Sequence, residues 1–379
     1  MKVMTIVGTR PEIIRLSRII PCLDAHVQHV LVHTGQNYDD ELNGIFFRDL
    51  GLRAPDIDLH AAGATTAETI GLTIARIDPV LQSERPDAVL ILGDTNSSLA
   101  AIAAKRRHIP IFHMEAGNRC FDERVPEETN RRIVDHIADI NLPYSAIARE
   151  YLLREGIAPD RVITTGSPMY EVLQHYLPAI HGSDVLNRLG VAPEDYYVVS
   201  VHREENVDDQ AHFDAIISIL HRLGGSGRPV VVSTHPRTRK WLDERHILVP
   251  PGVSFLKPLG FLDYVRLQLD ARCTLSDSGT ITEESNILGF PALNLRETHE
   301  RPEGMEETAV IMTGLRPERV MEALTLAEAQ PRGADRTLRL APDYAVPNVA
   351  DKVLRIILSY TDYVRRVVWQ ERTENPGGR

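Results

Sequence analysis

Two series of short apolar runs, each run followed by a helical or turn pattern, constrain the fold of this chain more than any other feature. In the first half the runs cover residues 2–7, 30–33, 88–92, 109–114, 140–143 and 162–165. The pattern restarts in the second half, with runs at 197–201, 229–233, 272–276 and 291–295. Strands that alternate with helices form parallel sheets with crossover helices. We therefore predict an α/β protein with two Rossmann-like domains, whose parallel sheets face each other across a cleft.

The junction between the two series is expected within residues 166–193, a stretch with several Pro and Gly residues. We assign residues 1–168 to an N-terminal domain, 169–346 to a C-terminal domain and 347–379 to a C-terminal helix and tail. The amphipathic pattern over 348–369 predicts a long helix that either domain can accept. Shorter helices are expected over 12–23, 96–107 and 127–138.

Charge and composition exclude several classes of partner. The net charge of −11 argues against a nucleic-acid-binding protein, which needs a basic face. No apolar run approaches the roughly 18 residues that span a bilayer, and residues 2–7 are predicted to be a strand rather than part of a signal peptide. Cys22, Cys120 and Cys273 lie far apart in the sequence, as is typical of reduced thiols. We expect a cytoplasmic protein with no nucleic-acid or membrane partner.

Single glycines beside polar residues follow several of the predicted strands: Gly8, Gly35, Gly93 and Gly279. For any one of them a tight turn is a sufficient explanation. Their recurrence favours a binding edge, because ligands bind outside the carboxyl ends of the strands in an open α/β sheet. Neither G-x-G-x-x-G nor G-x-x-x-x-G-K-[ST] occurs, so a bound nicotinamide or a P-loop nucleotide is not supported, and we expect no cofactor.

Two predicted helix N-termini carry groups suited to an anion. Arg10 follows the first strand and adds a forked donor to a helix end that already favours phosphate; a surface pair with Glu12 explains it about as well. Ser278, Gly279 and Thr280 open a second helix, with Glu284 one turn further on. An ordinary N-cap followed by acidic residues accounts for that segment equally well.

The segment 113–131 carries the groups most suited to acid/base chemistry. Asp94, Glu115 and Glu127 follow predicted strands or open predicted helices, where a substrate proton can be moved by a carboxylate. Helix capping explains Asp94 and Glu127, but it explains Glu115 less well, since that residue stands between a strand and Ala-Gly. His202 and His235 end two strands of the second half, without the spacing of a zinc site.

The motifs, taken together, resemble those of the non-hydrolysing UDP-N-acetylglucosamine 2-epimerases. The matching segments occur in one order along nearly the whole chain: GTRPE, TGQNYDDEL, LGDTNS, HMEAGNR, PEETNR, TGSP, HREEN, DSGTITEES and ERPEG. The resemblance implies a GT-B fold with the nucleotide between two Rossmann-like domains. It also implies inversion at C2 of a UDP-2-acetamido sugar, without a cofactor, by a homodimer.

The same resemblance implies a role for each candidate residue. Asp94, Glu115 and Glu127 would be the acid/base carboxylates around C2, and His202 would assist departure of the diphosphate. The groups that would bind UDP are Arg10, Ser278, Gly279, Thr280 and Glu284. The supporting candidates are Arg15, Arg119, Arg131 and His235.

Several positions depart from the usual family pattern. Arg15 replaces a lysine, and Glu204 replaces a basic residue of a segment that helps form an activator site in many bacterial members. The second change argues against activation by another UDP-sugar. The spellings EAGNRCFDERVPEE and LRETHERPEGMEE look closer to a branch that converts UDP-2-acetamido-2,6-dideoxy-L-talose to UDP-N-acetyl-L-fucosamine. Three alternatives stay open: a GT-B glycosyltransferase, a hydrolysing 2-epimerase and a non-catalytic UDP-sugar sensor.

Overall fold

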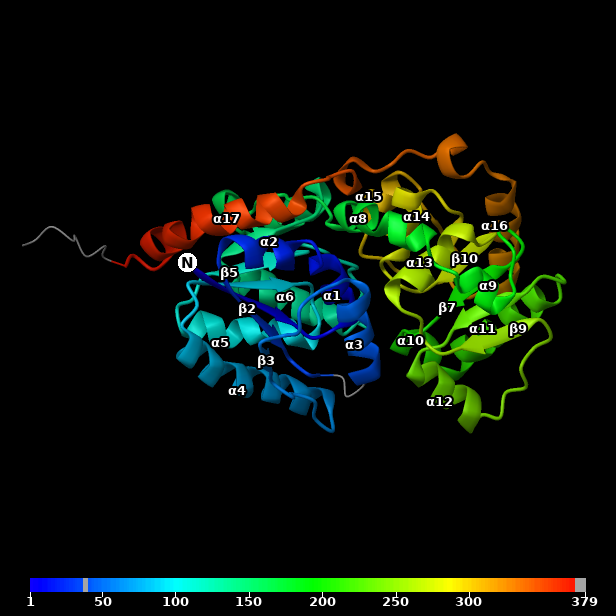
Figure 1. Cartoon of the computed structure of the whole chain (residues 1–379), viewed down its shortest axis with the longest axis horizontal. Coiled ribbons are helices and arrows are strands. Elements are labelled where there is room, and N and C mark those ends of the chain that lie inside the picture. Colours follow the sequence, from blue (N-terminus) through cyan, green and yellow to red (C-terminus); the bar gives the residue numbers. More distant parts are fainter. Residues whose placement is uncertain (37–39, 372–379) are drawn as a thin grey trace, which may run out of the picture. The chain divides into compact units, whose positions relative to one another are not determined.

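The computed structural model describes residues 1–36 and 40–371, so three positions of the TGQNYDDEL motif, 37–39, lie outside the described residues. The chain forms two compact units. Unit 1 comprises Met1–Val172 together with the segment from Val346 onward, and unit 2 comprises Leu173–Ala345. The C-terminal helix α17, Val349–Tyr363, packs against α2 of unit 1 (Figure 1). The tail therefore returns to the N-terminal unit.

Unit 1 contains a six-stranded parallel sheet in the order β3-β2-β1-β4-β5-β6. Its strands are β1 Lys2–Val7, β2 Gln28–His33, β3 Ile57–Asp58, β4 Ala88–Leu92, β5 Ile111–Met114 and β6 Ile140–Leu142. Its helices are α1 Arg10–Leu16, α2 Ile19–His26, α3 Asp40–Asp49, α4 Thr66–Glu84, α5 Ala101–Arg106, α6 Glu127–Ile137 and α7 Ala146–Arg154. Helix α8, Met169–His181, leads into unit 2.

Unit 2 repeats this arrangement with the order β12-β11-β10-β7-β8-β9, again all parallel. Its strands are β7 Tyr197–Ser200, β8 Val230–Ser233, β9 Val253–Leu256, β10 Cys273–Ser276, β11 Ala292–Asn294 and β12 Ile311–Met312. Its helices are α9 Val185–Leu189, α10 Glu204–Val207, α11 Gln210–Gly224, α12 Pro236–Glu244, α13 Phe261–Asp270, α14 Ile281–Leu288, α15 Pro302–Glu306 and α16 Pro317–Ala329. Short 3₁₀ or π turns cover Asn96–Ala100, Pro159–Arg161, Gly333–Asp335, Pro342–Tyr344 and Val364–Val368.

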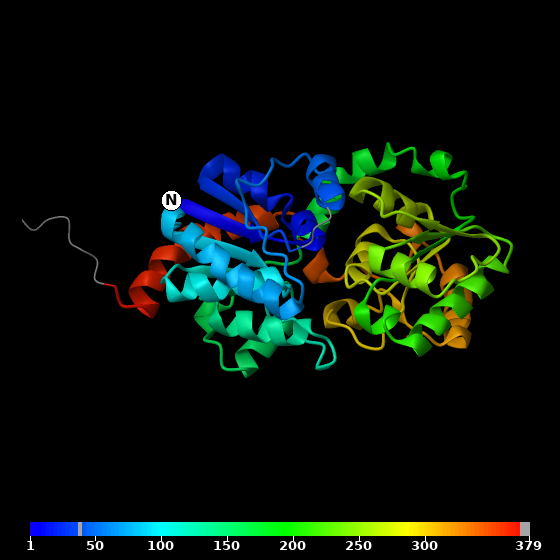
Figure 2. The same ribbon diagram turned by 90° about the horizontal axis from the view of Figure 1, so that it is seen from below.

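The strands are mostly apolar because both faces of each sheet are covered by helices (Figures 1 and 2). In β7, Tyr197 and Val199 join a core with residues of α11 and α16. Val198, between them, points to the other face and joins a core with Leu267 of α13. The alternation of side chains along a strand thus fills two separate cores. The predicted α/β class with two Rossmann-like domains is confirmed.

Each sheet reverses its strand order once, at its switch point. Within each unit, the loops that follow the two strands at this point lie next to each other. Both orders correspond to the Rossmann order 3-2-1-4-5-6, with the reversal between β1 and β4 in unit 1 and between β7 and β10 in unit 2. Polar residues follow all four of these strands, and three of the loops also contain a glycine: residues 8–10, 93–95, 202–203 and 277–279. The switch-point loops therefore carry Arg10 and Asp94 in unit 1 and His202, Ser278 and Gly279 in unit 2.

Some local predictions were wrong. The helix expected over 12–23 is two helices, because the Ser17 N–H bonds to Ile14 O and closes a tight last turn of α1. Val162 forms a single bridge to Asn141 and not a strand. The boundary between the two units, at residues 172 and 173, falls within the expected junction 166–193, which is mostly the helices α8 and α9. Strands β3 and β12 were missed because they have only two residues each, and β9 because it is only partly buried and its apolar run is interrupted by Ser254.

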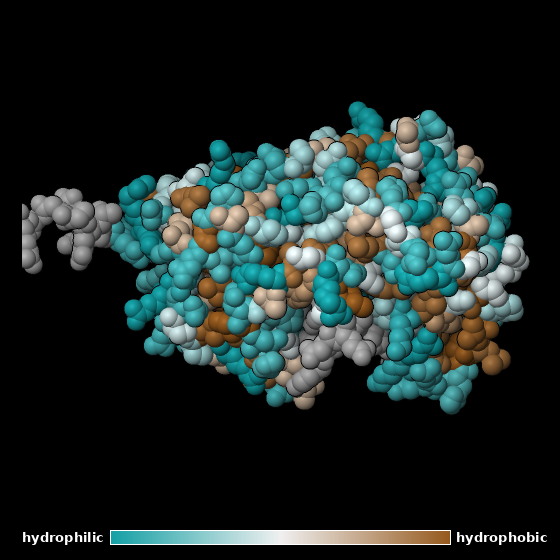
Figure 3. Space-filling view, in the orientation of Figure 1, coloured by the Kyte–Doolittle hydropathy of each residue, from teal (hydrophilic) through white to brown (hydrophobic). Residues whose placement is uncertain are grey.

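Polar side chains cover most of the face seen in Figure 3, and hydrophobic ones form small separate patches there. In the part of the chain that the structure describes, no helix has the length and apolar character required to cross a membrane.

Candidate functional site

The carboxylate of Asp94 is held at the end of β4 by a residue of α6. Arg131 Nε lies 2.9 Å and Arg131 Nη2 lies 2.7 Å from Asp94 Oδ2. Asn130 of the same helix donates to the Asp94 carbonyl oxygen at 3.0 Å. About 21% of the Asp94 side chain remains exposed, whereas Arg131 is buried. Hydrogen bonds to the backbone carbonyl oxygen and to one carboxylate oxygen therefore fix Asp94, while its side chain stays partly exposed.

Glu115 lies in the turn after β5, the strand that pairs with β4. Arg15 Nη1 of α1 donates to Glu115 Oε2 at 3.0 Å, and Asn118 Nδ2 donates to Glu115 Oε1 at 3.2 Å. A Cβ on Gly93 would lie 3.7 Å from Glu115 Oε2, so this carboxylate faces the residue before Asp94. Glu115 has a φ of 63°, an uncommon conformation for a residue with a side chain.

A buried ionic network supports that turn from beneath. Asp135 of α6 accepts hydrogen bonds from the Gly117 N–H and from Arg119 Nη1, and pairs with His113 Nδ1 at 2.9 Å. His113 Nε2 donates to the Gly93 carbonyl oxygen at 2.8 Å. Burial would lower the pKa of His113, but Asp135 outweighs it and raises that pKa. The network therefore ties the turn after β5 to the end of β4.

Arg119 belongs to this network and not to the Asp94 group. Its guanidinium is occupied by Asp135 at 2.7 Å and by Glu155 at 2.8 and 2.6 Å, and its side chain is buried. The structure thus places a predicted supporting residue where it supports the fold of the turn.

Glu127 is half-buried at the first position of α6. Its neighbour Glu128 is the more deeply buried carboxylate and accepts from Arg131 Nη1 at 2.9 Å and from the Cys120 N–H at 3.1 Å. Burial alone would raise the pKa of Glu128, but the Cys120 N–H and the Arg131 charge outweigh it and lower that pKa. Sequence reasoning missed Glu128, because two adjacent glutamates at a helix start look alike in a sequence.

Arg10 and Glu12 open α1 directly after β1. Arg10 is half-buried, with its guanidinium carbon 5.7 Å from the centre of the Phe46 ring. The carboxylate of Glu12 points back under the turn, where it accepts hydrogen bonds from the Gly8 and Thr9 N–H groups and from the Thr95 hydroxyl. Glu12 therefore joins the two loops of the unit 1 switch point.

In unit 2, Asp277 links the two loops of the switch point in a similar way. Its carboxylate accepts from the N–H groups of His202 and Arg203 and from Asn206 Nδ2, and it pairs with His202 Nδ1 at 3.2 Å. Burial would raise its pKa, but the His202 charge and these donors lower the pKa of Asp277 to about 2. About 38% of the His202 side chain is exposed. His235, at the end of β8, has its ring centre 5.9 Å from that of His202.

Ser278, Gly279 and Thr280 form the turn between β10 and α14. The Ser278 and Thr280 hydroxyls lie 3.0 Å apart. A Cβ on Gly279 would lie 2.6 Å from Glu300 Oε1, so the close approach of this carboxylate requires glycine. Backbone N–H groups at the start of a helix suit a phosphate.

Two arginines fix Glu300 against that turn. Arg203 Nη2 donates to Glu300 Oε1 at 3.3 Å, and Arg296 Nη1 donates to Glu300 Oε2 at 2.6 Å. Arg296 Nη2 is buried and has no hydrogen-bond partner within the described residues. Glu284 is buried in α14 and accepts from Gln268 Nε2 at 2.9 Å. The predicted residues of unit 2 are thus brought together, and the structure adds Arg203, Arg296 and Glu300 to them.

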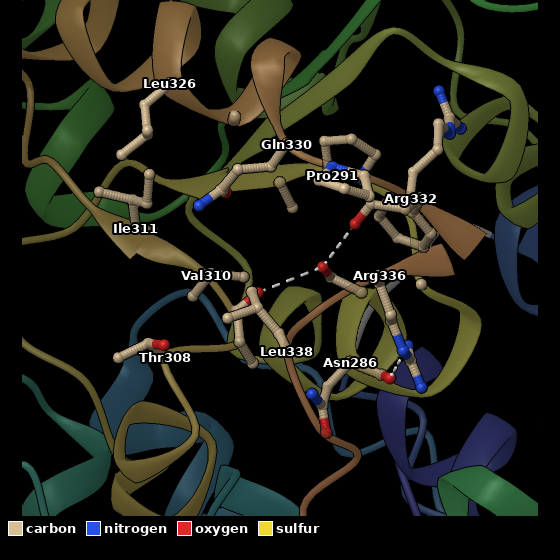
Figure 4. Close-up of a pocket in the computed structure, with 17 residues that line it drawn as sticks. Asn286, Pro291, Thr308, Val310, Ile311, Leu326, Gln330, Arg332, Arg336 and Leu338 are labelled. Carbon is tan, nitrogen blue, oxygen red and sulfur yellow. Dashed lines mark hydrogen bonds between the residues drawn. The ribbon is translucent and has the colours of Figure 1, made fainter. Parts of the chain in front are cut away.

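Unit 2 also contains a pocket of about 230 Å³ near the amino ends of its strands, away from the switch-point loops (Figure 4). Its walls include Gly289 at the end of α14, Pro291 just before β11 and Val310 just before β12. Arg336 donates to the Asn286 carbonyl oxygen at its border. Because it borders the amino ends of these strands, the pocket does not belong to the switch-point site. Within residues 1–36 and 40–371, no group of three or more His, Cys, Asp or Glu side chains has an arrangement that could hold a metal ion.

Two units with Rossmann strand order, each with a polar cluster at its switch point, define an α/β protein of the GT-B class. The family model described as UDP-N-acetylglucosamine 2-epimerase matches residues 22–358. The chain therefore belongs to the UDP-N-acetylglucosamine 2-epimerase family.

Three relatives illustrate the similarity. The structure of UDP-N-acetylglucosamine 2-epimerase from Rickettsia bellii is 48% identical, with a TM-score of 0.91 over 98% of this chain and 100% of that chain. UDP-N-acetylglucosamine 2-epimerase of Methanocaldococcus jannaschii is 35% identical over 337 residues, which cover 86% of this chain and 92% of the relative. UDP-2,3-diacetamido-2,3-dideoxy-D-glucuronate 2-epimerase of Pseudomonas aeruginosa is 31% identical over 85% of this chain and 91% of the relative.

The M. jannaschii enzyme has also been crystallised in complex with UDP-GlcNAc and UDP. That structure superposes with a TM-score of 0.88 at 31% identity, over 95% of this chain and 100% of that chain.

Proposed function

We propose that this protein is a non-hydrolysing 2-epimerase that inverts C2 of a UDP-2-acetamido sugar by eliminating UDP and adding it back. The observation that carries the proposal is the pair Asp94 and Glu115, two partly accessible carboxylates held by Arg131 and Arg15 at the switch point of unit 1. A reaction that removes a proton from one face of a carbon and returns it on the other needs two such groups.

The chemistry explains why UDP must leave first. The C2–H bond of a pyranose is not next to a carbonyl, so its proton is hardly acidic. When the C1–O bond breaks, its electron pair goes to the diphosphate and C1 becomes oxocarbenium-like. A carboxylate can then take the C2 proton, and the C–H electrons form the C1–C2 double bond of a 2-acetamidoglycal. Protonation of C2 on the opposite face and return of the diphosphate oxygen to C1 give the epimer.

We assign UDP binding to unit 2 and proton transfer to unit 1. The start of α14 with Ser278, Gly279 and Thr280 offers donors to the diphosphate, and Arg203 adds positive charge beside it. His202, anchored by Asp277, can donate a proton or a hydrogen bond to the departing oxygen. Glu284 would accept from the ribose hydroxyls, and Arg10 would bind a phosphate from unit 1.

The substrate that we propose to test first is UDP-GlcNAc, with UDP-ManNAc as its epimer. Relatives of this chain are named for UDP-GlcNAc and for a diacetamido-glucuronate, which differ at C3 and C6 of the sugar. C2 inversion with a 2-acetamido group is therefore the property common to these relatives. UDP-2-acetamido-2,6-dideoxy-L-talose is the second candidate, on the spelling of residues 115–128 and 295–307.

Incubation in heavy water tests the proposal. The purified protein should introduce deuterium at C2 of the UDP-sugar and build up both epimers, with UDP retained in the sugar nucleotide. A glycosyltransferase would leave C2 unexchanged, and a hydrolysing 2-epimerase would release free sugar and UDP. A sensor would bind UDP-sugar with no exchange, so the absence of deuterium for both candidate sugars would overturn the proposal. A homodimer is expected on the resemblance, and light scattering of the purified protein checks it.

A further inference from the structure

A buried carboxyl group joins the two loops that carry the candidate residues of unit 1. Glu12 Oε2 accepts hydrogen bonds from the Gly8 N–H at 2.5 Å and the Thr9 N–H at 3.1 Å, in the turn that leads to Arg10. Its other oxygen, Oε1, accepts from the Thr95 hydroxyl at 2.5 Å. One side chain thus bonds to the loop after β1 and to the loop after β4.

The loop after β1 has little freedom to adjust around this contact. A Cβ on Gly8 would overlap the hydroxyls of Ser97 and Thr34, which are hydrogen-bonded to each other at 2.8 Å. The turn therefore packs directly on the segment that follows Asp94. A small displacement of either loop would displace the other.

Thr95 transmits the contact to Asp94, its neighbour in the chain. Its hydroxyl oxygen accepts from the Ser97 N–H at 3.3 Å, so its proton is available for Glu12. On the side of α6, Arg131 donates to the Asp94 carboxylate and Asn130 donates to the Asp94 carbonyl oxygen. Two attachments, one from α1 and one from α6, therefore set the place of the Asp94 carboxylate.

Asp277 makes the equivalent connection in unit 2, with one difference. It pairs with His202, whose charge helps to keep the pKa of Asp277 at about 2. The hydrogen-bond partners of Glu12 are uncharged donors, and burial raises its pKa to about 7. The nearby ionisable groups have other contacts: Arg10 with Phe46, Arg15 with Glu115, and Asp94 with Arg131.

We propose that Glu12 is a positioning residue, whose ionised carboxyl group fixes the loop that carries Arg10 to the loop that carries Asp94. The proposal rests on the proposed epimerase function and deepens it. Three donors bond to the two oxygens of the carboxylate. A proton on the carboxyl group turns one oxygen into a donor, and the Thr95 hydroxyl then loses its acceptor. With a pKa of about 7, Glu12 is half ionised near pH 7, and its ionised form is lost as the pH falls further.

Glu68 provides a matched control for Glu12. It also stands at the third position of a helix, α4, behind a threonine N-cap, and its Oε2 accepts from the Ala64 N–H at 2.7 Å. Glu68 is exposed and makes no bond to the loop after β4. Glu68→Gln therefore measures the loss of helix capping alone.

Kinetics of C2 exchange test the positioning role. Glu12→Gln should lower kcat by roughly tenfold to a hundredfold, as expected for a misplaced catalytic group, while Glu68→Gln stays within about twofold of the original protein. The original protein should lose kcat below about pH 7 with uptake of one proton, and Glu12→Gln should lack this loss. Thr95→Val should lower kcat as Glu12→Gln does, whereas Thr95→Ser, which keeps the hydroxyl, should keep the kcat of the unsubstituted protein. If Glu12→Gln had the same kcat and the same pH profile as the unsubstituted protein, the proposal would be overturned.

Amide hydrogen exchange without substrate separates this proposal from the proposed function. The Gly8 and Thr9 amides should exchange at least about tenfold faster in Glu12→Gln than in the original protein, and no faster in Glu68→Gln. If no UDP-sugar shows C2 exchange, the proposed function fails and the amide result still decides the link between the loops. If Glu12→Gln does not fold, Thr95→Val against Thr95→Ser decides it by the same two measurements. Unchanged amide exchange in the variants would contradict the link.

Discussion

Arg131 places two guanidinium nitrogens on one carboxylate oxygen of Asp94, at 2.9 and 2.7 Å from Oδ2. Its third nitrogen, Nη1, holds Glu128 at 2.9 Å. Within the described part of the chain, no donor is hydrogen-bonded to Asp94 Oδ1. The arrangement fixes the carboxylate by one oxygen and leaves the other without a hydrogen bond from any described residue, as the proposed proton transfer requires.

Arg131→Gln should therefore lower kcat for C2 exchange by roughly tenfold to a hundredfold, because Asp94 loses its fixed orientation. The adjacent Arg132 is a matched control, since it binds Glu128 Oε1 at 3.0 Å and makes no contact with Asp94. Arg132→Gln should remain within about twofold of the original protein. Steady-state kinetics of both variants provide the measurement, and equal losses in the two would argue against a role for the Asp94 contact.

Glu115→Gln should nearly abolish C2 exchange while UDP binding is kept. A missing acid/base group costs typically 10² to 10⁴ in rate, whereas the groups that we assign to UDP lie mainly in unit 2. Deuterium incorporation measures the first effect, and titration calorimetry with UDP measures the second. Glu123→Gln is the control, because 88% of that side chain is exposed in the neighbouring loop. Retention of exchange in Glu115→Gln would remove this residue from the mechanism.

The fold was predictable because buried parallel strands are continuous apolar runs. The run at 88–92 gave β4 with the correct bounds, and the glycine and aspartate after it marked the switch-point loop. Elements with two or three exposed or mixed residues, such as Ile57–Asp58 and Ile311–Met312, carry no such signal. Helix 12–23 was misjudged because hydrophobic periodicity continues through the break at Ser17.

The sequence was sufficient to predict which side chains belong to the candidate site, but not which residues hydrogen-bond to them. A carboxylate after a strand, such as Asp94 or Glu115, is visible in the sequence. Its arginine is not, because Arg15 lies 100 residues before Glu115 and only the fold brings them together. The same holds for Glu300 and Gly279, whose close approach depends on the turn after β10. Arg119 was predicted as a supporting residue, but its partners Asp135 and Glu155 could not be read from the sequence.

Gly279→Ala should weaken UDP binding by about tenfold or more. The new Cβ would lie 2.6 Å from Glu300 Oε1, and Arg203 and Arg296 hold that carboxylate in place, so the turn must move. A shift of the helix N-terminus misdirects its N–H donors from the phosphate. Gly71→Ala is the control: nothing lies within 4 Å of its Cβ, and alanine stabilises a helix interior by about 0.5–1 kcal/mol. Equal UDP affinity in both variants, measured by calorimetry, would contradict the assignment.

Asp277→Asn should remove part of the acid sensitivity of folding. The pKa of Asp277 falls from 3.8 to about 2 on folding, so its contribution is present above about pH 4 and is lost as the pH falls through about 2. A shift of this size corresponds to about 2 kcal/mol. Urea unfolding should therefore give a difference between the original protein and Asp277→Asn of about that size at about pH 5, shrinking towards about pH 2. The exposed Asp243, changed to asparagine, should show no such window. A difference that stays constant with pH would mean that Asp277 acts through its hydrogen bonds and not through its charge.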